Sequence, residues 1–167
     1  NIVSYRIVMD KRLLFMLMGL FTLLTINLKA QLPFQLHDNG VTITCMGAGN
    51  GDVGVINGVQ YTAVNEESLR AKVRSGEDIS TVCTTLITDM SFLFYNYKGN
   101  PDIKTWDVSN VLSMEGMFQR ASTFNSDISR WDVSSVANMN CTFSRAIAFN
   151  QDISGWDVSN VRIMSGL

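Results

Sequence analysis

A repeat with a period of 25 residues is the feature that most constrains the fold of this chain. Its tryptophans, Trp106, Trp131 and Trp156, follow one another at that spacing within the words DIKTWDVSNV, DISRWDVSSV and DISGWDVSNV. A degenerate earlier copy begins at Val82. The same register places further apolar residues one period apart: Met114, Met139 and Met164, Phe118 and Phe143, Ala121 and Ala146, and Phe124 and Phe149. A fixed period of roughly 20 to 50 residues predicts a stacked array in which each unit buries its apolar face against its neighbours.

Two apolar spacings within one repeat indicate the elements that build it. Trp131 and Val133 flank one polar residue, which is the spacing of a short strand with one face inward. From Val111 to Ala121, apolar residues recur at intervals of three and four, which is typical of a short helix with one buried stripe. Ser109 stands just before that stretch, where its hydroxyl can cap the helix. We therefore predict an α/β fold, a leucine-rich-repeat-like solenoid of a short strand plus a short helix per 25-residue repeat, although the standard leucine spacing is absent.

The amino-terminal part of the chain has the order of a secretory signal peptide. Met9 is followed by the charged segment DKR and then by the apolar run LLFMLMGLFTLLTI. This run has 14 residues, fewer than the roughly 20 that a membrane-spanning helix needs, so cleavage is favoured over a retained membrane anchor. The small residue Ala30 places the cut before Gln31. Residues 1–8 then precede the start codon, residues 9–30 form the signal peptide, and no stable membrane span is expected after cleavage.

Residues 31–80 are predicted to form a small N-terminal α+β cap over the open end of the first repeat. A strand-like run ends at Cys45, and an Asn-Gly dipeptide between apolar residues farther along is a strong signal for a β-hairpin. Asn65 can cap a helix that Gly76 ends. These strands and this helix would cover apolar side chains and strand edges. The repeat array follows over residues 81–167 and stops inside a repeat, so we expect it to be truncated at its carboxyl end.

Composition and charge argue against several classes of function. The net charge is −2, and without residues 1–30 the balance is nine basic to 14 acidic residues with no basic cluster. Such a surface does not fit a phosphate backbone, so no nucleic acid partner is expected. His37 is the one histidine, which leaves little material for a histidine metal site or a histidine-activated nucleophile. We therefore expect no enzymatic activity, no metal site and no cofactor.

Three features that suggest ligands have plainer interpretations. Residues 49–54 match the dinucleotide-binding pattern G-x-G-x-x-G, but a hairpin signal follows them instead of the helix that would hold the pyrophosphate. Aspartates recur at two positions of each repeat, whereas calcium needs about six to eight converging oxygens, so hydrogen bonding within turns is favoured. The tryptophans share the phase of Val133 and its equivalents, so we expect them in the core and not as an exposed platform for sugars.

Cysteines offer one covalent link. Cys45 and Cys83 flank the cap region, and in an exported protein they can pair in a disulfide that closes the cap onto the first repeat. Their spacing says nothing about their distance, so the sequence leaves the pairing open. Cys141 aligns with a glycine of the previous repeat, as expected for a small buried residue and not for a nucleophile.

A variable column beside the tryptophans is the candidate interaction face. The residue before each tryptophan changes from repeat to repeat, and together with the following aspartate it would line one face of the predicted sheet. This candidate binding face comprises Thr105, Asp107, Arg130, Asp132 and Asp157. By contrast, Asn125 and Asn150 repeat at turns, where stacked asparagine side chains can satisfy backbone groups of the loops.

The repeat words resemble a known family. FNQDISGWDVSNV and the pattern MxxMFxxAxxFN are similar to the BspA-like leucine-rich repeat surface proteins, whose repeat was first noted in mycoplasmas as one of unknown function. The resemblance covers residues 82–167 and extends more weakly upstream. It implies a bacterial protein that is secreted or held at the cell surface and acts in adhesion or cell association. It carries no catalytic residues onto this chain.

Together these observations predict a secreted or cell-surface repeat protein that mediates protein–protein interaction or adhesion, with an extracellular protein or matrix ligand as its partner. Two alternatives stay open. The array can be the non-catalytic binding region of a larger secreted enzyme, or it can be a structural spacer of the cell envelope. A catalytic domain encoded downstream would indicate the first, and the absence of any saturable partner would indicate the second.

Overall fold

The computed structural model describes residues 33–166. The predicted signal peptide, its cleavage site at Ala30 and Gln31, and residues 1–8 lie outside the described residues. The described elements are the strands β1 (Phe34–Leu36), β2 (Ile43–Cys45), β3 (Val53–Ile56), β4 (Val59–Ala63) and β5 (Val82–Cys83), and the helix α2 (Glu66–Ser75). β1 and β2 pair antiparallel, and a second sheet has the order β3-β4-β5, in which β4 and β5 are parallel.

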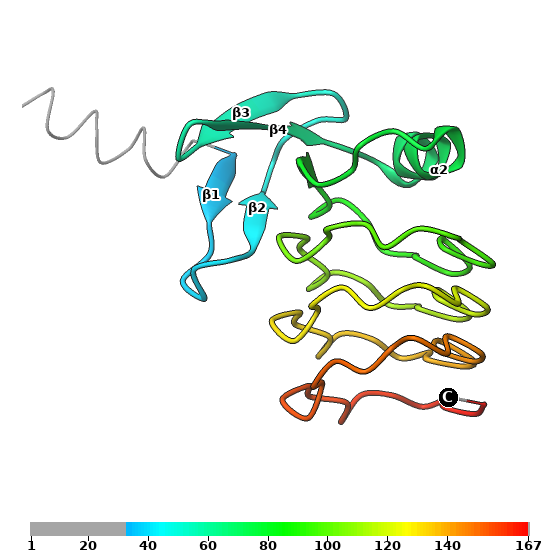
Figure 1. The fold of residues 1–167 in the computed structure, drawn as a ribbon. Coiled ribbons are helices and arrows are strands. Elements are labelled where there is room, and N and C mark those ends of the chain that lie inside the picture. Colours follow the sequence, from blue (N-terminus) through cyan, green and yellow to red (C-terminus); the bar gives the residue numbers. More distant parts are fainter. Residues whose placement is uncertain (1–32, 167) are drawn as a thin grey trace, which may run out of the picture. The chain divides into compact units, whose positions relative to one another are not determined.

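The local signals of the predicted cap formed as expected. Asn57 and Gly58 both adopt positive φ angles and join β3 to β4 in a tight hairpin (Figure 1). Asn65 caps α2, because its side chain accepts a hydrogen bond from the backbone N–H of Ser68. Gly76 ends the helix in a left-handed conformation. The helix packs its buried side chains against the core of the following repeats.

The predicted fold class is wrong. Within residues 33–166, no helix follows α2, and beyond β5 the repeats contain only turns and isolated parallel bridges. The bridges join single residues of successive repeats: Asp89 to Ser113, Ser113 to Asn138, and Asn138 to Ile163. The chain is thus not a solenoid of strand-plus-helix units. It is a small mixed α/β domain with one short helix, two small sheets and a disulfide, followed by loops that lie one above the next (Figure 1).

A left-handed residue in each repeat explains why the helical spacing produced no helix. Phe92, Gly116 and Cys141 occupy equivalent positions with φ angles of 56°, 56° and 55°, which a right-handed helix does not contain. Around each of them, backbone N–H groups alternate between two kinds of partner. The N–H of Gly116 donates to Asn140 O in the next repeat (2.8 Å), whereas that of Met117 donates three residues back (3.1 Å). Intervals of three and four therefore reflect a run of turns, and Ser109 has no helix to cap.

Aromatic rings and their hydrogen bonds form the core between repeats. The Phe118 ring lies between those of Phe94 and Phe143, nearly parallel to both, with centroids 5.5 and 5.4 Å away. The tryptophan rings stack in the same way, and the indole N–H of Trp131 donates to the Ile103 carbonyl 3.2 Å away. The prediction that the tryptophans face the core is confirmed for Trp106 and Trp131, which are buried, and the later Trp156 is partly buried.

We predict that Phe118→Ala strongly destabilises the protein. The Phe118 side chain is fully buried, and its removal leaves a cavity between the rings above and below it. Such truncations lower the free energy of unfolding by about 3–5 kcal/mol, which urea or thermal denaturation followed by circular dichroism would measure. Ile147→Ala is the matched control, because Ile147 is 84% exposed and its change should stay within about 0.5 kcal/mol. Equal stability of the two variants would contradict this account of the core.

Candidate functional site

The structure separates the residues of the candidate binding face. Asp107 is only 4% exposed, whereas Arg130, Asp132 and Asp157 are exposed on the later repeats. Thr105 is half-buried, and its backbone carbonyl accepts a hydrogen bond from the N–H of Ile43 in β2 (2.8 Å). The β1–β2 hairpin therefore covers the first part of this column, and only its continuation over later repeats faces solvent.

Asp107 belongs to a buried polar network that joins β2 to the repeats. Its carboxylate accepts from the Thr85 hydroxyl (2.5 Å) and from the Ser109 hydroxyl (2.7 Å). The Thr85 oxygen in turn accepts from the backbone N–H of Cys45 (3.0 Å). The backbone carbonyl of Asp107 also accepts from the Thr84 hydroxyl (2.8 Å). Each of these hydrogen bonds satisfies a polar group that would otherwise be costly to bury, so Asp107 acts as an anchor of the fold.

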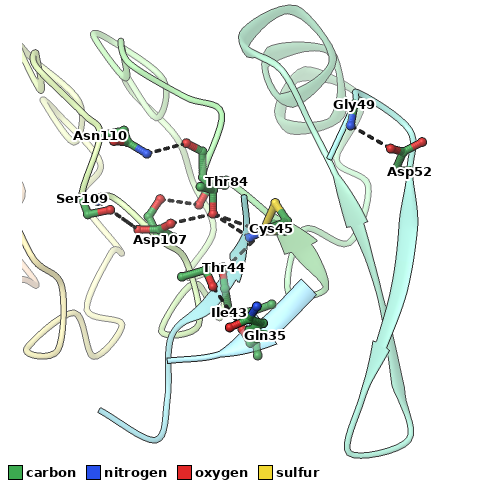
Figure 2. The surroundings of a disulfide bond; sticks show 12 residues. Gln35, Ile43, Thr44, Cys45, Gly49, Asp52, Thr84, Asp107, Ser109 and Asn110 are labelled. Carbon is green, nitrogen blue, oxygen red and sulfur yellow. Dashed lines mark hydrogen bonds between the residues drawn. A yellow bond between two sulfur atoms is a disulfide. The ribbon is translucent and has the colours of Figure 1, made fainter. Parts of the chain in front are cut away.

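A disulfide lies next to this network. The structure joins Cys45 of β2 to Cys83 of β5, the pair that the sequence left open, and so links the two sheets. Figure 2 shows the bond beside the hydrogen bonds that run from Cys45 toward Asp107 and Ser109. Because the linked residues are 38 positions apart, the bond closes a long loop and restricts the unfolded chain. Cys141 is a free, partly buried thiol.

The exposed aspartates of the repeats are used within turns. Asp132 and Asp157 each accept a hydrogen bond at 3.0 Å from the backbone N–H of the serine two residues later. Asp127 accepts both from the N–H of Ser129 (3.0 Å) and from its hydroxyl (2.7 Å). The backbone and side-chain hydrogen bonds from these serines lower the pKa of Asp127 and of Asp157 below the ordinary value. Turn hydrogen bonding, which the sequence analysis favoured over calcium binding, is thus the role that these carboxylates have here.

Two hollows flank the β1–β2 hairpin. The smaller one, about 40 Å³, has His37, Thr44, Asp107 and Asp132 among its lining residues. The larger one, about 250 Å³, lies where both hairpins meet the first repeat, and Tyr61 and Thr105 are among its lining residues. The smaller volume holds little more than one water molecule. Three residues of the candidate binding face line these two hollows: Thr105, Asp107 and Asp132.

The glycine-rich segment at residues 49–54 is a bulge at the start of a strand. The N–H of Gly51 donates to the Ala63 carbonyl, and the N–H of Ala63 donates to the carbonyl of Asp52. Gly51 and Asp52 therefore both lie opposite the single residue Ala63, which is the arrangement of a β-bulge. Gly51 has a φ of 90°, as this type of bulge requires. Gly54 lies directly against the ring of Phe34, where a side chain would collide. The segment continues into β3 and not into a helix, as the sequence analysis anticipated.

Sequence reasoning did not single out the exposed aromatic residues Phe92 and Tyr95. They occupy positions at which the next repeat has Gly116 and Gln119. A comparison of repeats at their variable positions would have found them, because aromatic residues there are not required by the repeated core. In the sequence alone, however, the spacing of apolar residues predicted a helix, and a helix would expose different positions from the turns that the structure contains.

Comparison with known proteins assigns the repeats to a family. Residues 63–167 match the model of a family described as "Mycoplasma protein of unknown function, DUF285". That match covers more than half of the chain. The chain belongs to this family. No curated protein and no solved structure matches the chain.

The DUF285 match begins at the end of β4 and includes α2, β5 and all of the repeats. β1, β2, β3 and most of β4 precede it, so Cys45 lies outside the matched region and Cys83 inside it. Among residues 33–166, no helix has the length and apolar character needed to span a membrane. The same part of the chain holds no group of three or more His, Cys, Asp or Glu side chains placed to bind a metal ion.

We predict that the disulfide contributes strongly to the stability of this DUF285 protein. Cys45→Ser should lower the free energy of unfolding by about 4 kcal/mol, the loop-entropy value for a separation of 38 residues. Cys141→Ser is the matched control, since that thiol is unpaired. Thermal melts of the two variants, with and without a reducing agent, measure the difference. If the reducing agent leaves the melting temperature of the wild type unchanged, the disulfide does not have this role.

Proposed function

We propose that this DUF285 protein is a secreted or cell-surface repeat protein of the BspA-like type that binds other proteins and has no enzymatic activity of its own. Its partner is an extracellular protein or a matrix component. The proposal rests on how the repeats divide their residues between the core and the surface. It agrees with the resemblance of the repeat words to surface proteins of that type.

The observation that carries the proposal is the contrast between largely constant buried residues and the exposed positions that vary beside the tryptophans. Met139 recurs in each repeat, and Trp131 recurs in each repeat after the degenerate first copy, which has Val82 at that position. Both residues lie in the core with inter-repeat stacking or hydrogen bonds. The residue before each tryptophan is free to change, and Arg130 at such a position is exposed. A framework of this kind keeps its backbone while its surface varies, which suits recognition of a protein partner.

Two features support a location outside the cytoplasm. The sequence of residues 9–30 has the order of a signal peptide. The Cys45–Cys83 disulfide is a type of bond that persists in oxidising compartments and is rare in the cytosol. Both features favour export, and neither depends on the identity of the partner.

The local chemistry of the carboxylates supports a binding role over a catalytic one. Asp107 is buried and satisfied by Thr85 and Ser109. Asp127 and Asp157 accept hydrogen bonds from serines two residues later, which keeps them ionised and lowers their pKa. A general acid requires a raised pKa and a substrate within reach, and these groups have turn partners instead.

Export is tested by the mature amino terminus. We expect the exported chain to begin at or near Gln31, because Ala30 is the small residue that follows the short apolar run. Cell fractionation followed by amino-terminal sequencing measures this. A chain recovered outside the cytoplasm that still carries residues 13–26 would mean that the segment acts as an anchor.

Binding is tested with immobilised matrix proteins. We expect at least one extracellular matrix protein to bind the chain saturably in surface plasmon resonance, with affinity lost when Phe118→Ala unfolds the repeats. Ile147→Ala, which changes one highly exposed side chain, is the folded control. Lack of saturable binding across a broad panel of extracellular proteins would favour a structural spacer of the cell envelope.

A further inference from the structure

Two aromatic side chains and an arginine form an exposed patch at the start of the repeats. Phe92 is 48% exposed and Tyr95 is 45% exposed, and their rings meet edge to face with centroids 6.2 Å apart. The guanidinium carbon of Arg120, from the next repeat, lies 5.9 Å from the centre of the Tyr95 ring. We call Phe92, Tyr95 and Arg120 the aromatic patch.

The backbone conformation at Phe92 is required by the repeat, but it does not require phenylalanine. Its φ is 56°, in the left-handed region that bulky side chains rarely adopt. The equivalent residue of the next repeat is Gly116, which has the same φ without a side-chain penalty. Nearly half of the Phe92 side chain is exposed, so the apolar area that it buries is well below that of a core phenylalanine. A bulky residue at a left-handed position where glycine also serves is the kind of local strain that clusters at functional sites.

The Phe92 ring is nevertheless held in place. It lies directly against Gly116, where a side chain on that residue would collide with the ring. Its edge-to-face contact with Tyr95 restrains it further. The ring therefore presents a rigid apolar surface to solvent, and a rigid anchor loses little entropy when it binds.

Charges of both signs lie near the aromatic patch: Arg120 belongs to it, and the acidic residues Asp89 and Glu115 lie close to Phe92 along the chain and across the repeats. Within residues 33–166 the ion pairs are Lys72–Glu77 and Lys104–Asp102, so Arg120 has no carboxylate partner there. Arg70 of α2 also lies close to Phe92, because its guanidinium donates to the backbone carbonyl of Ser91 (2.8 Å). The nearby carboxylate of Glu115 already accepts from the side chains of Asn138 and Asn140. The patch thus offers unpaired arginine charge beside apolar rings.

We propose that the aromatic patch is the contact site for a protein partner that presents an apolar side chain next to a carboxylate. This assignment rests on the proposed function and locates it. Phe, Tyr and Arg are enriched in the energetic centres of protein interfaces. The apolar side chain packs on Phe92 and Tyr95, and the carboxylate pairs with Arg120.

The test replaces Phe92 and Tyr95 with the residues of the next repeat and replaces Arg120 with an uncharged residue. Random dodecapeptides are selected on the chain by display, and the selected peptides are then measured against Phe92→Gly, Tyr95→Gln and Arg120→Gln. We expect selected peptides to combine apolar and acidic residues, and each of the first two variants to weaken binding about tenfold or more. Arg120→Gln should also reduce the salt dependence of binding. Ile147→Ala, the exposed control, should bind as the wild type does.

Stability separates a binding role from a structural one. Phe92→Gly relieves the left-handed strain but loses the packing of the ring on Gly116, so its melting temperature should stay close to that of the wild type. A loss of stability as large as that of Phe118→Ala would overturn the proposal. Peptides that bind all patch variants equally would also overturn it while leaving the proposed function intact. Patch-dependent binding of cellohexaose or chitohexaose without peptide binding would assign the patch to carbohydrate. Failure to bind any peptide or protein would count against both the patch and the proposed function.

Discussion

Hydrogen bonds between successive repeats are the constraint on which the rest of this structure depends. Every second N–H of the turn run donates to a carbonyl of the next repeat, as Phe92 does to Glu115 and Gly116 does to Asn140, both at 2.8 Å. This alternation needs a left-handed residue at fixed points of each repeat. It holds neighbouring loops at the spacing at which the rings of Phe94, Phe118 and Phe143 stack. Backbone pairing and ring stacking therefore stabilise the same arrangement.

The two small sheets are tied to this stack by a few specific bonds. The disulfide joins β2 to β5. Beside it, hydrogen bonds from Cys45 to Thr85 and from Thr85 to Asp107 lead into the repeats (Figure 2). β2 also donates directly to Thr105. As a result, the hairpin covers the beginning of the column that looked like a binding face. A polar residue that seemed available for a ligand is instead part of the anchor, because a buried carboxylate must be satisfied by its neighbours.

The repeats keep most of their core residues constant and vary some of their exposed ones, such as the residue before each tryptophan. This division supports a binding role for the DUF285 family member. It also allows the residues at equivalent positions of successive repeats to be compared. At one left-handed position the chain has phenylalanine, glycine and cysteine in turn: Phe92, Gly116 and Cys141. Where glycine meets the structural need, the exposed phenylalanine calls for another reason. Binding of a partner is the reason that its exposure and the unpaired Arg120 support.

Sequence by itself determined the repeat, its register and most of the local signals. The Asn-Gly hairpin and the helix between Asn65 and Gly76 follow from short-range chemistry. The period of the repeat indicated the buried tryptophans and the stacked asparagines, in which Asn150 N–H donates to Asn125 Oδ1 (2.9 Å). Tertiary structure decided the secondary structure of the repeats, because turns paired to the next repeat give apolar residues the same three-and-four spacing as a helix. It also decided the fate of Asp107 and the pairing of Cys45 with Cys83, since both depend on which distant segments meet. Spacing along a chain records periodicity, whereas hydrogen-bond partners and burial are properties of the packed molecule.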